Sequence, residues 1–98
     1  MEEISVSQLH DLEDVTVVDV REPDEFAGGH VPGAVNIPLQ SVPENLDSFD
    51  PDKPVYLICQ AGMRSERAAS YLDARGFDTV NVLGGTGAWA SAGLPLEH

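Results

Sequence analysis

Short runs of apolar residues alternate along this chain with segments in which apolar residues recur at helical spacing. The runs are rich in β-branched residues, which indicates strands buried on both faces. We predict strands at residues 16–20, 34–37, 55–58 and 79–83, and a short edge strand at residues 4–6. Because strands and helices alternate throughout, the pattern favours a parallel sheet covered by helices on both faces.

Helix signals occupy the segments between these strands. Ser5 or Ser7 is placed to cap a first helix. The strongest candidate covers residues 65–75, because small and apolar residues share one side of it and Gly76 follows its end. Shorter helices are predicted at residues 23–27, 41–46 and 87–92.

Size and composition indicate one compact domain. The chain has 98 residues, of which 42% are hydrophobic, which is enough for a single interior. No repeat or low-complexity segment divides it. We therefore predict a single domain over residues 1–95. Residues 96–98, with the sequence Leu-Glu-His, are interpreted as a remnant of an expression tag.

The charge balance restricts the partners that the chain is expected to bind. A formal net charge of -12, with only five Lys and Arg residues, argues against nucleic acid. An anionic substrate would need a locally positive pocket. No apolar stretch reaches the length of a membrane span, and no secretory signal is visible. The single cysteine cannot form an internal disulfide and fits a reducing compartment, so we predict a cytoplasmic protein without a membrane partner.

Candidate chemistry concentrates around that single cysteine, Cys59. It follows the predicted strand at residues 55–58 and precedes a short loop with Gly62 and the start of a helix. Sites in parallel sheets form at the carboxyl ends of strands, and a helix amino terminus adds free N–H groups there. Such surroundings lower the pKa of a thiol and favour the nucleophilic thiolate. The alternative is a buried structural cysteine, which is the commoner fate of this residue type.

Four segments together resemble the signatures of the rhodanese superfamily. They are Asp-Val-Arg-Glu at 19–22, Gly-His-Val-Pro-Gly-Ala at 29–34, Cys-Gln-Ala-Gly-Met-Arg-Ser at 59–65 and Gly-Gly-Thr-Gly-Ala-Trp at 84–89. They occur in the order of that superfamily and cover nearly the whole chain. The resemblance implies an α/β fold, a three-layer α/β/α sandwich with a mostly parallel central sheet of about five strands.

The resemblance also implies sulfurtransferase activity. Cys59 would be the catalytic residue, taking a sulfane sulfur from a donor such as thiosulfate as a persulfide and passing it to a thiophilic acceptor. An alternative is a carrier module that hands the persulfide sulfur to a partner protein. No cofactor is implied, and the histidines show no metal-site spacing. The substrate-binding residues would be those of the loop, Gln60, Ala61, Gly62, Met63, Arg64 and Ser65.

The length of the loop argues against a third interpretation, a phosphatase or arsenate reductase. Four residues separate Cys59 from Arg64, whereas cysteine phosphatases have five. A shorter loop leaves less room for the oxygens of a phosphate than for a single terminal sulfur. The loop also lacks His and Asp, one of which would serve as general acid for an ester leaving group. Arg64 is expected to help hold an anionic donor.

Other conspicuous residues receive supporting roles. Asp19 and Arg21 either organise the loop by hydrogen bonds or form an internal ion pair, and both alternatives stay open. His30 is interpreted as structural, because sulfur transfer does not require a base. The glycines at 84–87 lack the lysine of a phosphate-binding loop, and Trp89 is expected in the core.

Overall fold

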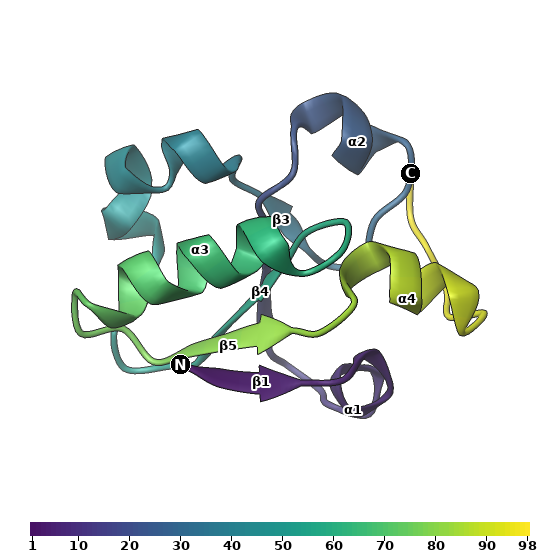
Figure 1. The fold of residues 1–98 in the computed structure, drawn as a ribbon, viewed down its shortest axis with the longest axis horizontal. Helices are drawn as coiled ribbons and strands as arrows, with labels where there is room; N and C mark the ends of the chain where they lie inside the picture. The colour runs from purple at the N-terminus through teal and green to yellow at the C-terminus, as the bar shows by residue number, and fades with distance from the viewer.

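Five parallel strands form the central sheet of the computed structural model, which describes residues 1–98. The strand order is β1-β5-β4-β2-β3, and every neighbouring pair is parallel (Figure 1). The strands are β1 (Glu2–Ile4), β2 (Thr16–Asp19), β3 (Val35–Asn36), β4 (Val55–Ile58) and β5 (Thr79–Val82). The predicted parallel sheet is confirmed.

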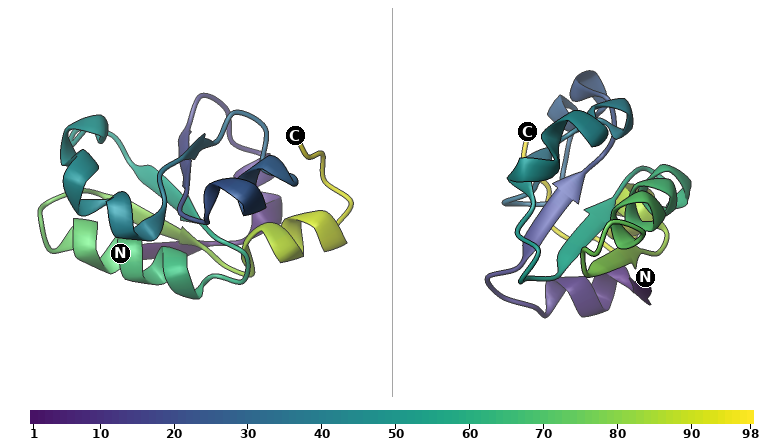
Figure 2. Two further views of the ribbon diagram at one scale, coloured as in Figure 1. Left: turned by 90° about the horizontal axis from the view of Figure 1, so that it is seen from above. Right: turned by 90° about the vertical axis from the view of Figure 1, so that its left-hand side faces the viewer.

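Helices cover both faces of this sheet (Figures 1 and 2). They are α1 (Val6–His10), α2 (Pro23–Ala27), α3 (Met63–Asp73) and α4 (Gly85–Ser91), with 3-10 helices η1 (Leu39–Ser41) and η2 (Pro43–Ser48). One core joins α3 and the 3-10 segments to the sheet through residues such as Leu57 and Leu72. The other joins α1 and α4 to it through residues such as Ile58 and Trp89. The three-layer sandwich is confirmed.

Several element boundaries differ from the predicted ones: the edge strand ends earlier, and the helices predicted at 65–75 and 87–92 each begin two residues earlier, at Met63 and Gly85. The Ser5 hydroxyl accepts a hydrogen bond from the amide of Gln8 and caps α1, so Val6 is already helical and the edge strand ends at Ile4. The predicted edge strand at residues 4–6 was therefore placed two residues too late. Gly62 has a left-handed backbone with φ of 107°, which lets the chain turn directly into α3 at Met63. The segment predicted as a helix at 41–46 is a pair of 3-10 helices.

The carboxyl-terminal residues contact the body of the domain. His30 and Glu97 exchange two backbone hydrogen bonds of 2.9 and 2.8 Å. The Glu97 carboxylate also accepts a bond from the amide of Gly33 at 2.9 Å. The interpretation of residues 96–98 as a tag remnant stays a prediction.

No helix combines the length and the apolar character that crossing a membrane requires. The longest, α3, has 11 residues, of which Ser65, Ala68, Ala69 and Leu72 are buried against the sheet. Helix α3 therefore packs on the sheet. It follows β4 and the loop that contains Cys59.

Candidate active site

Cys59 lies at the carboxyl end of β4, in the loop that leads into α3. Its side chain is buried, with the residue only 1% exposed. The Gly62 amide donates a hydrogen bond to Sγ at 3.0 Å, and the Ser65 hydroxyl lies 3.4 Å from it. The sulfur is therefore surrounded by hydrogen-bond donors at the start of a helix, where the backbone dipoles also favour negative charge.

These surroundings act on the pKa of the Cys59 thiol in opposite directions. Burial raises it, because a charge is costly away from water. The Ser65 hydroxyl and the amides of Ser65, Gly62 and Ala61 lower it, because they donate to the charged form. The hydrogen bonds together outweigh burial, so the pKa lies below the ordinary value of a thiol. The hydrogen bonds thus favour the thiolate of Cys59, which is the reactive form of cysteine.

A buried network fixes the position of Ser65. Its hydroxyl lies 2.6 Å from Asn81 Oδ1, and Asn81 Nδ2 donates to the Gly62 carbonyl at 3.3 Å. Asn81 is on β5 and is 1% exposed. A serine has one hydroxyl proton, so Asn81 and the Cys59 sulfur compete for it. The network ties both ends of the loop to the neighbouring strand.

Replacement of Ser65 by alanine tests the contribution of this hydroxyl. Because a donor to the thiolate is lost, we expect Ser65→Ala to raise the pKa of Cys59. The acid limb of kcat/KM for sulfur transfer should then move to higher pH. Thiolate absorbance against pH measures the same shift directly. Ser70→Ala, on the exposed side of the same helix, is the control and should leave the profile unchanged. An unchanged profile in Ser65→Ala would assign the hydroxyl proton to Asn81 alone.

The start of α4 lies beside the loop that leads into α3 (Figure 1) and donates hydrogen bonds to the backbone of that loop. The Thr86 amide donates to the Cys59 carbonyl at 2.8 Å, and the Gly87 amide donates to the Gln60 carbonyl at 3.0 Å. This approach depends on Gly85, where a Cβ atom would clash with the Cys59 carbonyl and lie 2.7 Å from the Gln60 carbonyl. The sequence analysis did not assign this role to the glycines at 84–87, although their position after β5 was a signal.

Asp19 and Arg21 fulfil both of the roles that were left open. Arg21 is 3% exposed and donates to both carboxylate oxygens of Asp19, with the shortest distance 2.8 Å. It also donates to the Gly29 carbonyl at 2.8 Å and to Gln60 Oε1 at 3.3 Å. The buried ion pair therefore also reaches the loop through the Gln60 side chain.

The side chain of Arg64 forms an ion pair with Glu25. It donates to both carboxylate oxygens of Glu25, at 2.7 and 3.0 Å, and so links α3 to α2. The side chains of Arg64 and Glu25 are 36% and 33% exposed. Sequence reasoning had placed Arg64 at the site but had missed its partner.

The remaining loop residues differ in accessibility. Gln60 and Ala61 are exposed, and Met63 is 73% exposed, which is unusual for a large apolar residue. Gly62 and Ser65 are buried with Cys59. Of the predicted substrate-binding residues, Gly62 and Ser65 contact the sulfur of Cys59. The side chains of Gln60 and Arg64 instead contact Arg21 and Glu25.

His30 lies outside this loop. Its Nδ1 is 2.7 Å from the Phe26 carbonyl, and its ring stacks on Phe26 with the centroids 3.7 Å apart. These contacts are those of a structural residue. No three His, Cys, Asp or Glu side chains gather in a way that could hold a metal ion.

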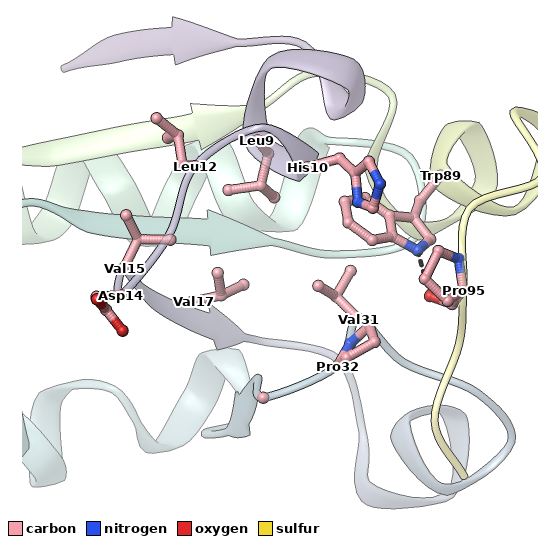
Figure 3. Close-up of a pocket in the computed structure, with 11 residues that line it drawn as sticks. Leu9, His10, Leu12, Asp14, Val15, Val17, Val31, Pro32, Trp89 and Pro95 are labelled. Atoms are coloured by element: carbon pink, nitrogen blue, oxygen red, sulfur yellow. Dashed lines mark hydrogen bonds between the residues drawn. The ribbon is translucent and has the colours of Figure 1, made fainter.

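A hollow of about 270 Å³ lies on the side of the sheet that carries α1 and α4 (Figure 3). None of residues 59–65 lines it. Its apolar walls are formed by Leu9, Leu12, Val15, Val17, Val31 and Trp89. It is separate from the Cys59 loop.

The fold and the site together place this chain among α/β proteins that carry a reactive cysteine in the loop after a central parallel strand. In this chain the residue is Cys59, whose sulfur accepts a hydrogen bond from a loop amide. The model of the rhodanese-like domain matches residues 5–92. The chain is 41% identical to the putative sulfurtransferase YtwF of Bacillus subtilis, over 97% of this chain and 96% of that protein. It is 37% identical to the thiosulfate sulfurtransferase GlpE of Pseudoalteromonas translucida, over 91% and 89% of the two chains.

The crystal structure of a rhodanese-related protein from Thermoplasma volcanium has the same fold. It superimposes with a TM-score of 0.94 at 33% identity, covering 99% of this chain and 98% of that one. The chain belongs to the rhodanese-like domain family, and the resemblance noted from its sequence is confirmed. Its relatives in this family are named as sulfurtransferases, so sulfur transfer is the activity at family level.

Proposed function

We propose that this chain is a sulfurtransferase that carries a sulfane sulfur as a persulfide on Cys59. The main support is the environment of the sulfur, which accepts a hydrogen bond from the Gly62 amide at 3.0 Å in a buried loop. Both the thiolate and a terminal persulfide sulfur are anions, and the same donors stabilise both. The names of the relatives support the same class of reaction.

The reaction has two half-reactions. In the first, the Cys59 thiolate attacks the outer sulfur of thiosulfate, the new S–S bond forms and the bond to the sulfite group breaks with the electron pair leaving on sulfite. In the second, a nucleophilic acceptor attacks the terminal sulfur and restores the thiolate. Neither step needs a general acid, which agrees with the uncharged side chains of residues 60–63.

The acceptor must come from outside the chain. Cys59 is the only cysteine, so no second thiol resolves the persulfide as an internal disulfide. The acceptor is a small thiophile or a sulfur-accepting protein. If the chain is a carrier module, it loads with sulfur but turns over slowly until that protein is present.

Two assays of the wild type separate sulfur transfer from phosphate chemistry. We expect measurable thiocyanate formation from thiosulfate and cyanide. We expect no hydrolysis of an aryl phosphate at high protein concentration, because four residues between Cys59 and Arg64 make a tight loop. Phosphatase turnover that depends on Cys59 would overturn the proposal. Sulfur loading without cyanide turnover, followed by transfer to an acceptor protein, would favour the carrier.

A further inference from the structure

The two arginines of the site are both held by carboxylates. Arg21 is buried in its pair with Asp19. Arg64 is engaged by Glu25 through two bonds in a fork geometry. Residues 60–63 carry no charge, and Arg67, one turn further along α3, shares a surface hollow with Glu66 and Ser70. The loop therefore offers an anionic ligand amides but no unpaired cation.

Arg64 lies in the first turn of α3, directly after the loop that contains Cys59, and the ion pair with Glu25 dominates its electrostatic surroundings. The hydrogen bonding that Arg64 donates to Glu25 is the largest influence on the pKa of Arg64 and raises it. Burial lowers this pKa, and the charges of Glu25 and the Cys59 thiolate raise it further. The hydrogen bond from Arg64 in turn is the main cause that lowers the pKa of Glu25 to about 2. The pair therefore stays ionised at neutral pH, with the guanidinium directed at Glu25.

The charge at the site disfavours donors with two negative charges. Thiosulfate is a dianion that must approach a thiolate while Glu25 neutralises Arg64, the arginine next to the loop. Every added negative charge on the donor is repelled by the thiolate, and the neutral loop amides offset this repulsion less than an unpaired guanidinium would. A donor in which an organic group replaces one oxygen of thiosulfate, R–SO2–S⁻, has one charge fewer and the same transferable sulfur.

Resting on the function proposed above, we propose that Glu25 determines donor specificity by withholding Arg64, so that the site favours monoanionic organic thiosulfonates over the thiosulfate dianion. The chemistry is unchanged: the Cys59 thiolate bonds to the outer sulfur, the donor S–S bond breaks, and the electron pair leaves on a sulfinate instead of on sulfite. The total charge is conserved in both cases, and no oxidant or reductant is needed.

Kinetics with thiosulfate and benzenethiosulfonate in the wild type and in Glu25→Gln test this role. Release of Arg64 should lower KM for thiosulfate roughly fivefold, because the freed guanidinium then attracts the dianion. KM for the monoanion should fall less, and kcat should change little for either donor. The gain should shrink at high salt, where such attractions are screened.

Two further variants separate the ion pair from general charge effects. Glu66→Gln removes one negative charge from the first turn of α3, but Glu66 makes no ion pair with Arg64. It should leave the ratio of the two kcat/KM values as in the wild type. Arg64→Ala leaves Glu25 unpaired and should raise KM for thiosulfate. Thermal unfolding of each variant verifies that the fold is kept.

The inference is overturned if Glu25→Gln leaves both KM values unchanged, or if Glu66→Gln lowers KM for thiosulfate equally. A fall in KM in Arg64→Ala would overturn it as well, even if Glu25→Gln did not fold. The mass of the wild type after treatment with benzenethiosulfonate distinguishes this failure from that of the proposed function. A sulfur adduct on Cys59 upholds the persulfide whatever the KM values show.

Discussion

Cys59→Ser is expected to abolish sulfur transfer while leaving the fold intact. Serine has a similar volume and keeps its place among the amide donors, but its hydroxyl is far less nucleophilic than a thiolate. Turnover with thiosulfate and cyanide should fall by at least about 10³-fold. Initial rates at matched protein concentration measure the loss.

Thermal unfolding and far-UV circular dichroism of the same samples are the control for this variant. A folded Cys59→Ser protein without activity assigns the loss to the chemistry of the sulfur. Turnover close to that of the wild type in a folded variant would show that Cys59 is a buried structural cysteine.

Gly85→Ala should both destabilise the protein and displace the loop that contains Cys59. A Cβ atom at Gly85 would clash with the Cys59 carbonyl, and the backbone there has a φ of 57°. Overpacking and strain together should cost about 3 kcal/mol of unfolding free energy. Sulfur transfer should also fall, because the loop must move away from the amides of Thr86 and Gly87. Urea unfolding and kcat/KM measure the two effects.

Gly93→Ala provides a matched control for this variant. Gly93 has a similar φ of 75°, but nothing lies within 4 Å of a Cβ atom there. Its substitution should cost only the backbone strain, about 1 kcal/mol, and leave activity unchanged. Equal losses of stability in both variants, with activity retained in Gly85→Ala, would refute the role assigned to the close contact with Cys59.

Local patterns made the fold and the place of the site predictable. The β-branched runs located β2, β4 and β5, and the alternation with helices indicated the parallel sheet. A cysteine directly after β4 then had to lie at the carboxyl edge of that sheet, where sites form. Helix α3 begins at Met63, two residues before the predicted start, because the sequence shows a glycine at 62 but not its left-handed conformation.

Long-range contacts could not be predicted in the same way. The Arg64–Glu25 pair joins residues 39 positions apart, and several carboxylates were equally available in a chain with 17 Asp and Glu residues. The bonds from Thr86 and Gly87 to the loop depend on how α4 lies against it. The Asn81–Ser65 contact likewise depends on the packing of β5 beside α3. Tertiary packing decides each of these partners, and no local pattern specifies it.

The most direct test of the account is the intact mass of the wild type after incubation with thiosulfate and removal of the excess. We expect an increase by the mass of one sulfur atom, located on the peptide that contains Cys59, lost on treatment with cyanide and missing in Cys59→Ser. A wild-type mass that does not change with any sulfane donor, or an adduct that also forms on Cys59→Ser, would contradict the persulfide.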